Sequence, residues 1–110
     1  MKIKEEKEGE VLICRLEGEI NINTSPELRK SFDRMMRDNE KKVIVEFSGI
    51  SYIDSSGLAT LIEMYQRLKR NGGRLKLCSM TQKVRDIFEI TKLTKLFEIF
   101  PNLTEALEGF

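Results

Sequence analysis

One short apolar run restricts the folds open to this chain more than any other feature. Residues 43–47 read Val-Ile-Val-Glu-Phe, a pattern typical of a strand that is buried in a parallel sheet. A helix-periodic segment follows, with apolar side chains at Leu58, Leu61, Ile62, Tyr65 and Leu68. Asn71-Gly72-Gly73 is a strong signal for the end of that helix. These segments predict a buried strand followed by a helix at residues 58–70.

The N-terminal part shows the same alternation. Residues 2–4 predict a short strand that pairs with a second strand at residues 11–16, which is broken at Gly18. Ser25, Pro26 and Glu27 then fit the N-cap, the first helical position and the acidic first turn of a helix. The apolar face of that helix consists of Leu28, Phe32, Met35 and Met36.

The C-terminal third continues the pattern. Strands are expected at residues 75–78 and 97–99, with a helix capped by Thr81 between them and a final helix after Asn102. The apolar residues of these two helices are Val84, Ile87 and Phe88, and Leu103, Ala106, Leu107 and Phe110. The alternation predicts one α/β domain over residues 1–110, with a four- to five-stranded mixed or mainly parallel sheet and about four helices.

The charge balance and the absence of histidine exclude several classes of function. The 110 residues include 19 Lys+Arg and 18 Asp+Glu, interleaved along the chain, for a net charge of +1. A nucleic-acid partner is therefore not expected. Without His the chain has no His acid–base catalyst, no Ser-His-Asp or Cys-His nucleophile and no His metal ligand. We expect no catalytic site, no metal and no cofactor.

Two cysteines and the N-terminus indicate the compartment. Cys14 and Cys78 each lie among apolar neighbours and form no Cys-x-x-Cys motif, so we expect reduced thiols in the core. The N-terminus is charged and no apolar run of signal length follows it. No run approaches the ~18 apolar residues of a membrane span. These features favour a cytoplasmic protein with no membrane partner.

The segment between the buried strand and the central helix carries the most chemical information. Asp54, Ser55 and Ser56 can each cap a helix by accepting hydrogen bonds from its free backbone N–H groups. The helix dipole also favours a phosphate there, either bound or esterified to a serine. Capping does not explain Gly57, which costs about 1 kcal/mol of helix propensity relative to Ala. A close approach by backbone or by a partner would explain it.

Three enzymatic interpretations of this segment fail on residues that they require. Ser55-Ser56-Gly57 matches half of a Gly-x-Ser-x-Gly elbow, but Ile53 stands where the first Gly belongs and no His is present. Asp54 as the phosphate acceptor of a receiver domain would need an adjacent acidic pair, whereas Glu17 and Glu19 are separated by a glycine. The chain also has no P-loop motif.

Residues 43–59 resemble the signature of the STAS family of anti-sigma factor antagonists, in which an apolar strand and a short loop precede Asp-Ser-Ser/Thr-Gly-Leu at a helix start. Residues 16–28 resemble the family's Gly-Glu-Leu-Asp loop before its first helix. Residues 71–78 resemble its second helix stop and the following strand. The resemblance spans roughly residues 10–108, and it implies a sheet with its major helices packed mainly on one face.

The resemblance also implies a non-catalytic binding module that phosphorylation controls. In the family, the unphosphorylated protein binds an anti-sigma factor that is also a serine kinase, and a sigma factor is released for transcription. The kinase phosphorylates the first Ser of the motif, here Ser55, and the phosphorylated protein dissociates. A PP2C-type phosphatase then restores it. A monomer is expected, with a weak dimer as the alternative.

Two residues depart from the family pattern. Asn21 stands where the upstream loop commonly has Asp, and Glu46 replaces a common Asp at the end of the strand. Loss of the carboxylate at position 21 could alter the choice of partner or the handling by the kinase, because this loop lies beside the serine in the family. We expect neither change to affect the fold.

Candidate site residues lie on three segments. Asp54, Ser56 and Gly57 form the loop and helix start around Ser55. Candidate partner contacts are Ile20, Asn21, Asn23, Thr24 and Ser25 before the first helix, and Thr60, Glu63 and Arg67 on the expected exposed side of the central helix. Two other functions stay open. One is a STAS scaffold subunit of a constitutive signalling or transport complex with no phospho-switch, and the other is a nucleotide-binding protein.

Overall fold

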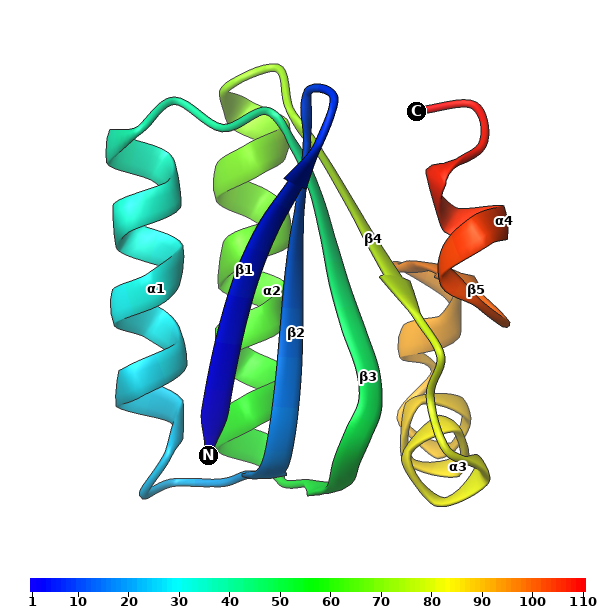
Figure 1. The fold of residues 1–110 in the computed structure, drawn as a ribbon. Coiled ribbons are helices and arrows are strands. Elements are labelled where there is room, and N and C mark those ends of the chain that lie inside the picture. Colours follow the sequence, from blue (N-terminus) through cyan, green and yellow to red (C-terminus); the bar gives the residue numbers. More distant parts are fainter.

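The computed structural model describes residues 1–110, which form one five-stranded sheet and four α-helices (Figure 1). The strands are β1 (Lys2–Glu8), β2 (Val11–Ile20), β3 (Lys42–Ile53), β4 (Arg74–Cys78) and β5 (Glu98–Phe100). The helices are α1 (Ser25–Arg37), α2 (Ser55–Arg70), α3 (Gln82–Ile90) and α4 (Leu103–Leu107), with a short 3-10 helix at Leu93–Lys95. The predicted α/β class is confirmed.

The strands lie in the sheet in the order in which they occur in the chain. The order is β1-β2-β3-β4-β5, with β1 antiparallel to β2 and the other neighbours parallel. In open α/β sheets, ligand crevices form at points where the strand order reverses. This sheet has no such reversal, so its topology offers no ready crevice for a small substrate.

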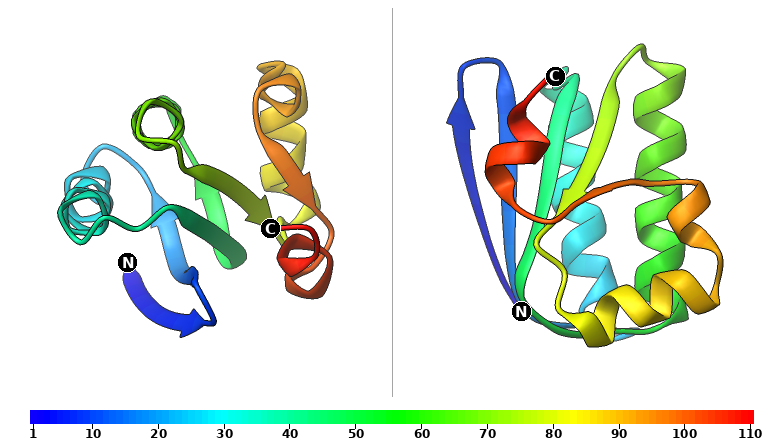
Figure 2. Two further views of the ribbon diagram at one scale, coloured as in Figure 1. Left: turned by 90° about the horizontal axis from the view of Figure 1, so that it is seen from above. Right: turned by 90° about the vertical axis from the view of Figure 1, so that its right-hand side faces the viewer.

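Three helices pack on one face of the sheet and one on the other (Figure 2). The face under α1, α2 and α3 holds the larger core, in which Phe47, Phe88 and Phe97 pack edge to face. The opposite face holds a smaller cluster under α4, formed by Val11, Ile13, Ile44, Cys78 and Ala106. The expectation that the major helices share one face is therefore confirmed.

A buried lysine fixes α4 to the sheet. Lys76 on β4 is 1% exposed, and its Nζ donates hydrogen bonds to the carbonyl oxygens of Ala106 and Glu108, each at 2.8 Å. The rings of Phe100 and Phe110 lie 4.9 and 4.4 Å from the ammonium. Burial lowers the pKa of Lys76. The ammonium thus satisfies carbonyl groups at the end of the helix that would otherwise lack partners.

Strands β2 and β3 are longer than predicted. β2 continues through Gly18, whose φ of +116° suits glycine, and β3 continues beyond residue 47, where the predicted strand ends, to Ile53. The added parts pair with each other, from Glu17 with Gly49 to Ile20 with Ile53, and the register shifts once just before this part and once between Gly18 and Glu19. Ile50 and Ile53 are buried, so extending the strands adds to the core.

Several helix boundaries also differ from the predicted ones. Thr24, not Ser25, is the N-cap of α1, while Ser25 is buried and its hydroxyl donates to the carbonyl of Asn21 at 2.7 Å. α4 ends at Leu107, short of Phe110, where the extended Glu108 and Gly109 with φ +66° stop it. The cap by Thr81 and the stop after residue 70 are confirmed.

The two cysteines are buried on opposite faces of the sheet. Cys14 belongs to the larger core and Cys78 to the smaller one, and both are free thiols. Burial raises the pKa of Cys14 to about 12 and also raises the pKa of Cys78. The prediction that both cysteines lie in the core is confirmed.

Candidate functional site

Ser55 lies at the corner where β3 turns into α2. It is the first residue of the helix and its side chain is exposed. Asp54 is the N-cap, with an extended backbone, and its Oδ1 accepts a hydrogen bond from the Gly57 N–H at 3.0 Å. The corner therefore presents a serine hydroxyl to the surroundings beside a carboxylate that is already engaged by the backbone.

Asp54 also holds the loop between β2 and α1. Its Oδ2 accepts a hydrogen bond from the Ile22 N–H at 3.1 Å, and its own N–H donates to the carbonyl of Ile20 at 3.0 Å. Both carboxylate oxygens thus accept backbone N–H groups, so the carboxylate has a structural role. The β2–α1 loop and the start of α2 form one connected surface.

Gly57 is required by the close approach of the two strand ends. A Cβ at this position would lie 2.6 Å from side-chain carbons of Ile20 and Ile53 and 3.1 Å from the Ile20 carbonyl oxygen. The close approach that the sequence predicted at Gly57 is therefore confirmed, and the ends of the chain's own strands β2 and β3 make it. The glycine lets α2 start directly on the end of the sheet.

Asn21 organises the loop through its amide oxygen. Oδ1 accepts hydrogen bonds from the N–H groups of Asn23 and Thr24 at 2.9 and 3.1 Å, while Thr24 Oγ1 donates to the Glu19 carbonyl at 2.8 Å. An amide oxygen accepts these bonds as a carboxylate oxygen would. The Asn at this position therefore keeps the turn while removing a negative charge from the surface.

A shallow groove runs between the first turns of α1 and α2, next to Ser55. It has a volume of about 350 Å³ and is lined by Ile22, Ser25, Pro26, Arg29, Ser56, Ala59 and Thr60. Ile22 stands at its rim with 71% of its surface exposed. Sequence reasoning does not single out Ile22; the available signal was an apolar residue between two asparagines in a polar loop. Its place at the groove, next to Ser55, makes Ile22 a candidate anchor for a protein partner.

Several predicted partner contacts are wrong or only partly accessible. Ile20 is 0% exposed and offers no surface to a partner, while Ser25 and Thr60, at 4 and 1% exposed, contribute only small parts of the groove lining. Glu63 and Arg67 face α1, where they pair with Arg29 at 3.1 Å and Asp33 at 2.6 Å. The predicted exposed side of the helix is therefore its α1 side. Asn23 is exposed, and Asn21 and Thr24 are half-buried.

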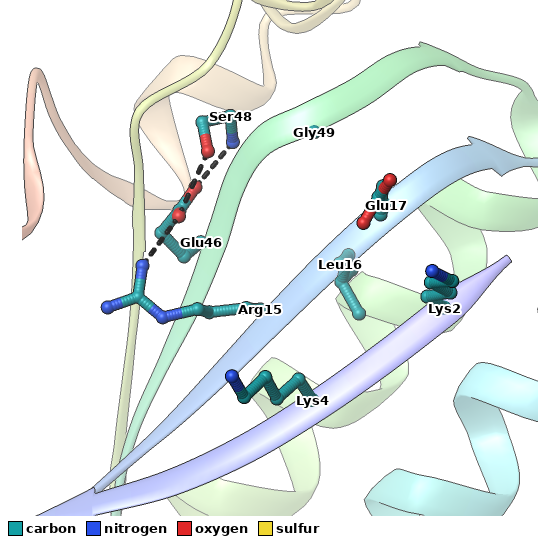
Figure 3. A pocket seen from close by; sticks show the side chains of 8 residues that line it. All are labelled: Lys2, Lys4, Arg15, Leu16, Glu17, Glu46, Ser48 and Gly49. Carbon is teal, nitrogen blue, oxygen red and sulfur yellow. Dashed lines mark hydrogen bonds and ion pairs between the residues drawn. The ribbon is translucent and has the colours of Figure 1, made fainter.

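A second pocket, of about 600 Å³, lies on the face of the sheet that carries α4 (Figure 3). Glu46 at its floor accepts hydrogen bonds from Arg15 Nη1 and Ser48 Oγ, both at 3.0 Å, and Arg15 is also held by Glu6 at 2.6 Å. The Glu at position 46 thus has a structural role. Its charge and that of Arg15 are compensated within the network, so the pocket presents no free reactive group at this pair.

No three His, Cys, Asp or Glu side chains gather closely enough to hold a metal ion. No helix has the length and apolar content that crossing a bilayer would need. The features of the surface that suit recognition are therefore the exposed serine, the loop tied to it and the adjacent groove.

Comparisons with known proteins agree with this description. The STAS domain family matches residues 2–106. The anti-sigma F factor antagonist of Paenibacillus polymyxa is 27% identical over 108 residues, which are 97% of this chain and 92% of the relative. Among solved structures, an anti-sigma factor antagonist from Mycobacterium paratuberculosis has a TM-score of 0.88 at 24% identity, covering 96% of this chain and 90% of that one. The structure of SpoIIAA in its unphosphorylated form has a TM-score of 0.82 at 22% identity, and the match covers 97% of this chain and 94% of that one. This chain belongs to the STAS domain family.

Proposed function

We propose that this protein is an anti-sigma factor antagonist, a non-catalytic binding module that is switched by phosphorylation of Ser55. The observation that carries the proposal is the placement of the Ser55 hydroxyl, exposed at the first position of α2 and joined through Asp54 to the β2–α1 loop. The relatives named as antagonists of anti-sigma F and anti-sigma-B factors support the same function.

The chemistry of the corner suits a phosphate acceptor better than an enzyme. The neighbouring carboxylate of Asp54 accepts two backbone N–H groups, and the chain has no His to act as a base. Ser55 therefore lacks an internal base, and the kinase would supply one. SpoIIAA, which shares this fold, has been solved in both an unphosphorylated and a phosphorylated form, which is consistent with such a cycle.

Phosphorylation would change the docking surface through charge. A phosphoserine carries about −1.5 to −2 charges at neutral pH, and at position 55 it would lie next to the Asp54 carboxylate. The helix N-terminus can accommodate part of that charge in the free protein. In a complex the charge would lose water and face a partner surface fitted to a neutral hydroxyl. A loss of about 3 kcal/mol in binding free energy weakens the affinity more than a hundredfold.

The proposed partner is an anti-sigma factor with serine kinase activity, which the unphosphorylated protein would bind so that a sigma factor is released. A PP2C-type phosphatase would reverse the modification. Because the kinase uses ATP and the sigma factor acts in transcription, the cycle would take place in the cytoplasm. Ile22, Asn23 and the groove beside Ser55 are the proposed contact surface.

Phosphorylation by an anti-sigma factor kinase of the same organism tests the proposal. Intact-mass spectrometry after incubation with ATP should show one added phosphate on the wild type and on Ser56→Ala, and none on Ser55→Ala. The Ser56 variant is a matched control because it removes the neighbouring hydroxyl of the same helix turn. Equal labelling of Ser55→Ala would refute the assignment.

A binding measurement separates the switch from a constitutive scaffold. Ser55→Ala should bind the unmodified anti-sigma factor as the wild type does, while Ser55→Asp should bind at least tenfold more weakly. Equal recovery of both variants with the partner would favour a scaffold subunit with Ser55 as a structural residue.

A further inference from the structure

The outer edge of the sheet at β1 is uncovered. β1 pairs with β2 along one side only, and no helix lies beyond its other side in the view from above (Figure 2, left). An edge strand presents unpaired backbone N–H and C=O groups that can pair with another strand. This edge extends over the seven residues of β1.

The hairpin geometry determines which residues of β1 face outward. Glu8 and Val11 are paired across the two-residue turn at Gly9–Glu10, and such a closing pair exchanges both backbone hydrogen bonds. Hydrogen-bonded pairs alternate with non-hydrogen-bonded ones along an antiparallel ladder. The N–H and C=O groups of Ile3, Glu5 and Lys7 therefore point away from β2, toward the free edge.

The even-numbered residues place their side chains together on the face of the sheet that carries α4. They are Lys2, Lys4, Glu6 and Glu8, with the two lysines at one end of the strand and the two glutamates at the other. Lys2, Lys4 and Glu8 take part in none of the protein's own salt bridges, while Glu6 pairs with Arg15 at 2.6 Å. Three of the four charges are thus free for an external partner.

This strand is complementary to itself in one register. If a second copy pairs antiparallel with Glu5 opposite Glu5, Lys2 lies opposite Glu8 and Lys4 opposite Glu6, each twice about the two-fold axis. These are non-hydrogen-bonded pairs, in which side chains approach closely. A shift by two residues one way places Lys4 opposite Lys4, and the other way Glu6 opposite Glu6. A shift by one residue would place residues whose backbone groups point to the free edge opposite residues whose backbone groups point to β2, so the hydrogen bonds could not form.

We infer that β1 is a homodimerisation edge, at which two copies of this chain form one continuous sheet. The outward groups of residues 3, 5 and 7 would supply the hydrogen bonds. The two Glu5 carboxylates that meet at the axis are each already paired with Arg34 of their own copy. Little apolar surface is covered, so the dimer is weak and sensitive to salt. The same charges discourage pairing with unrelated strands.

The inference is independent of the proposed function. β1 starts at the end of the molecule where α2 begins (Figure 1), so a two-fold axis near Glu5 places the two Ser55 corners at opposite ends of the dimer. Neither corner is covered. The dimer can therefore exist whether or not Ser55 is phosphorylated.

A charge-exchange experiment tests the edge. The double variants Lys2→Glu/Lys4→Glu and Glu6→Lys/Glu8→Lys each make the even positions of one sign, so each alone should associate at least tenfold more weakly than the wild type. An equimolar mixture should recover association as a heterodimer, because every pair is again complementary. Sedimentation equilibrium at low salt measures this. Lys30→Glu/Lys95→Glu is the control for Lys2→Glu/Lys4→Glu, because it makes the same change in net charge at exposed sites away from β1.

A second experiment tests the register. In a mixture of Lys4→Cys and Glu6→Cys proteins, mild oxidation should cross-link the two variants to each other faster than either to itself, because residue 4 of one copy lies opposite residue 6 of the other. Cys14 and Cys78 are buried and do not compete. A wild type that stays monomeric at millimolar concentration, or charge variants that dimerise as it does, would overturn the inference.

Discussion

The carboxylate of Asp54 accepts a hydrogen bond from the backbone N–H of Ile22, 32 residues earlier in the chain, at 3.1 Å. Its second oxygen accepts from Gly57 in the first turn of α2. One side chain therefore fixes both the loop that presents an exposed apolar residue and the helix start that presents Ser55. The proposed docking surface and the proposed modification site are parts of the same small structure.

Replacement of Asp54 by Ala should loosen both segments. Loss of a helix cap alone costs about 1 kcal/mol, and the bond to the Ile22 N–H is lost as well, so we expect the free energy of unfolding to fall by about 1–2 kcal/mol. Urea denaturation measures this change. Hydrogen exchange at residues 21–24 should also speed up. Thr81→Ala, which removes the cap of α3, is the control, because it should leave exchange in that loop unchanged.

Gly57→Ala should destabilise the protein although alanine is the better helix former. Helix propensity alone predicts a gain of about 1 kcal/mol. The new Cβ would lie 2.6 Å from carbons of both Ile20 and Ile53, and overpacking of this kind typically costs about 1–3 kcal/mol. A thermal melt decides the sign of the change. A variant that melts above the wild type would show that the strand ends can separate.

Ile22→Asp should weaken partner binding without affecting the fold. Ile22 is 71% exposed beside the groove, and removal of a central anchor at an interface costs 1 kcal/mol or more, roughly fivefold or more in affinity. Ile90→Asp is the matched control, since Ile90 is 81% exposed on α3. Titration calorimetry with the anti-sigma factor compares them. Equal binding by both variants would place the contact surface elsewhere.

The buried thiol of Cys14 should make stability fall at alkaline pH. Burial raises its pKa from 9.0 to about 12, so above pH 9 the unfolded thiol ionises while the folded one stays protonated. The free energy of unfolding should then fall by about 1.4 kcal/mol per pH unit from this group, and the contribution is intact below pH 9. Urea denaturation at a series of pH values should show a shallower fall for Cys14→Val.

The central part of the fold could be predicted from the sequence because each local signal agreed with the tertiary structure. The apolar run at residues 43–47 is a buried strand, and the glycines after Asn71 end α2 where one of them takes a positive φ. Three major helices share one face of the sheet, as the family resemblance implied. Burial and backbone conformation determine these features, and the types of the individual residues indicate both.

The prediction failed where pairing between distant segments decides the structure. Residues 48–53 contain Ser, Gly and Tyr and lie beyond the predicted strand, but they pair with an equally irregular extension of β2. Thr60, Glu63 and Arg67 looked like a solvent-facing stripe because their partners on α1 are about 30 residues away in the chain. The location of Ser55 at a corner was predictable, whereas its link to Ile22 depends on a contact that no local pattern reveals.

The course of β1 has a practical consequence for experiments on this protein. Because β1 runs antiparallel to β2, Met1 lies within 4 Å of where a side chain on Gly18 would be, at the end of the molecule that carries Ser55 (Figure 1). An affinity tag or fluorescent fusion placed before Met1 would emerge at the same end of the molecule as Ser55, where it could obstruct an incoming kinase. One attached after Phe110 emerges at the opposite end and leaves that approach open.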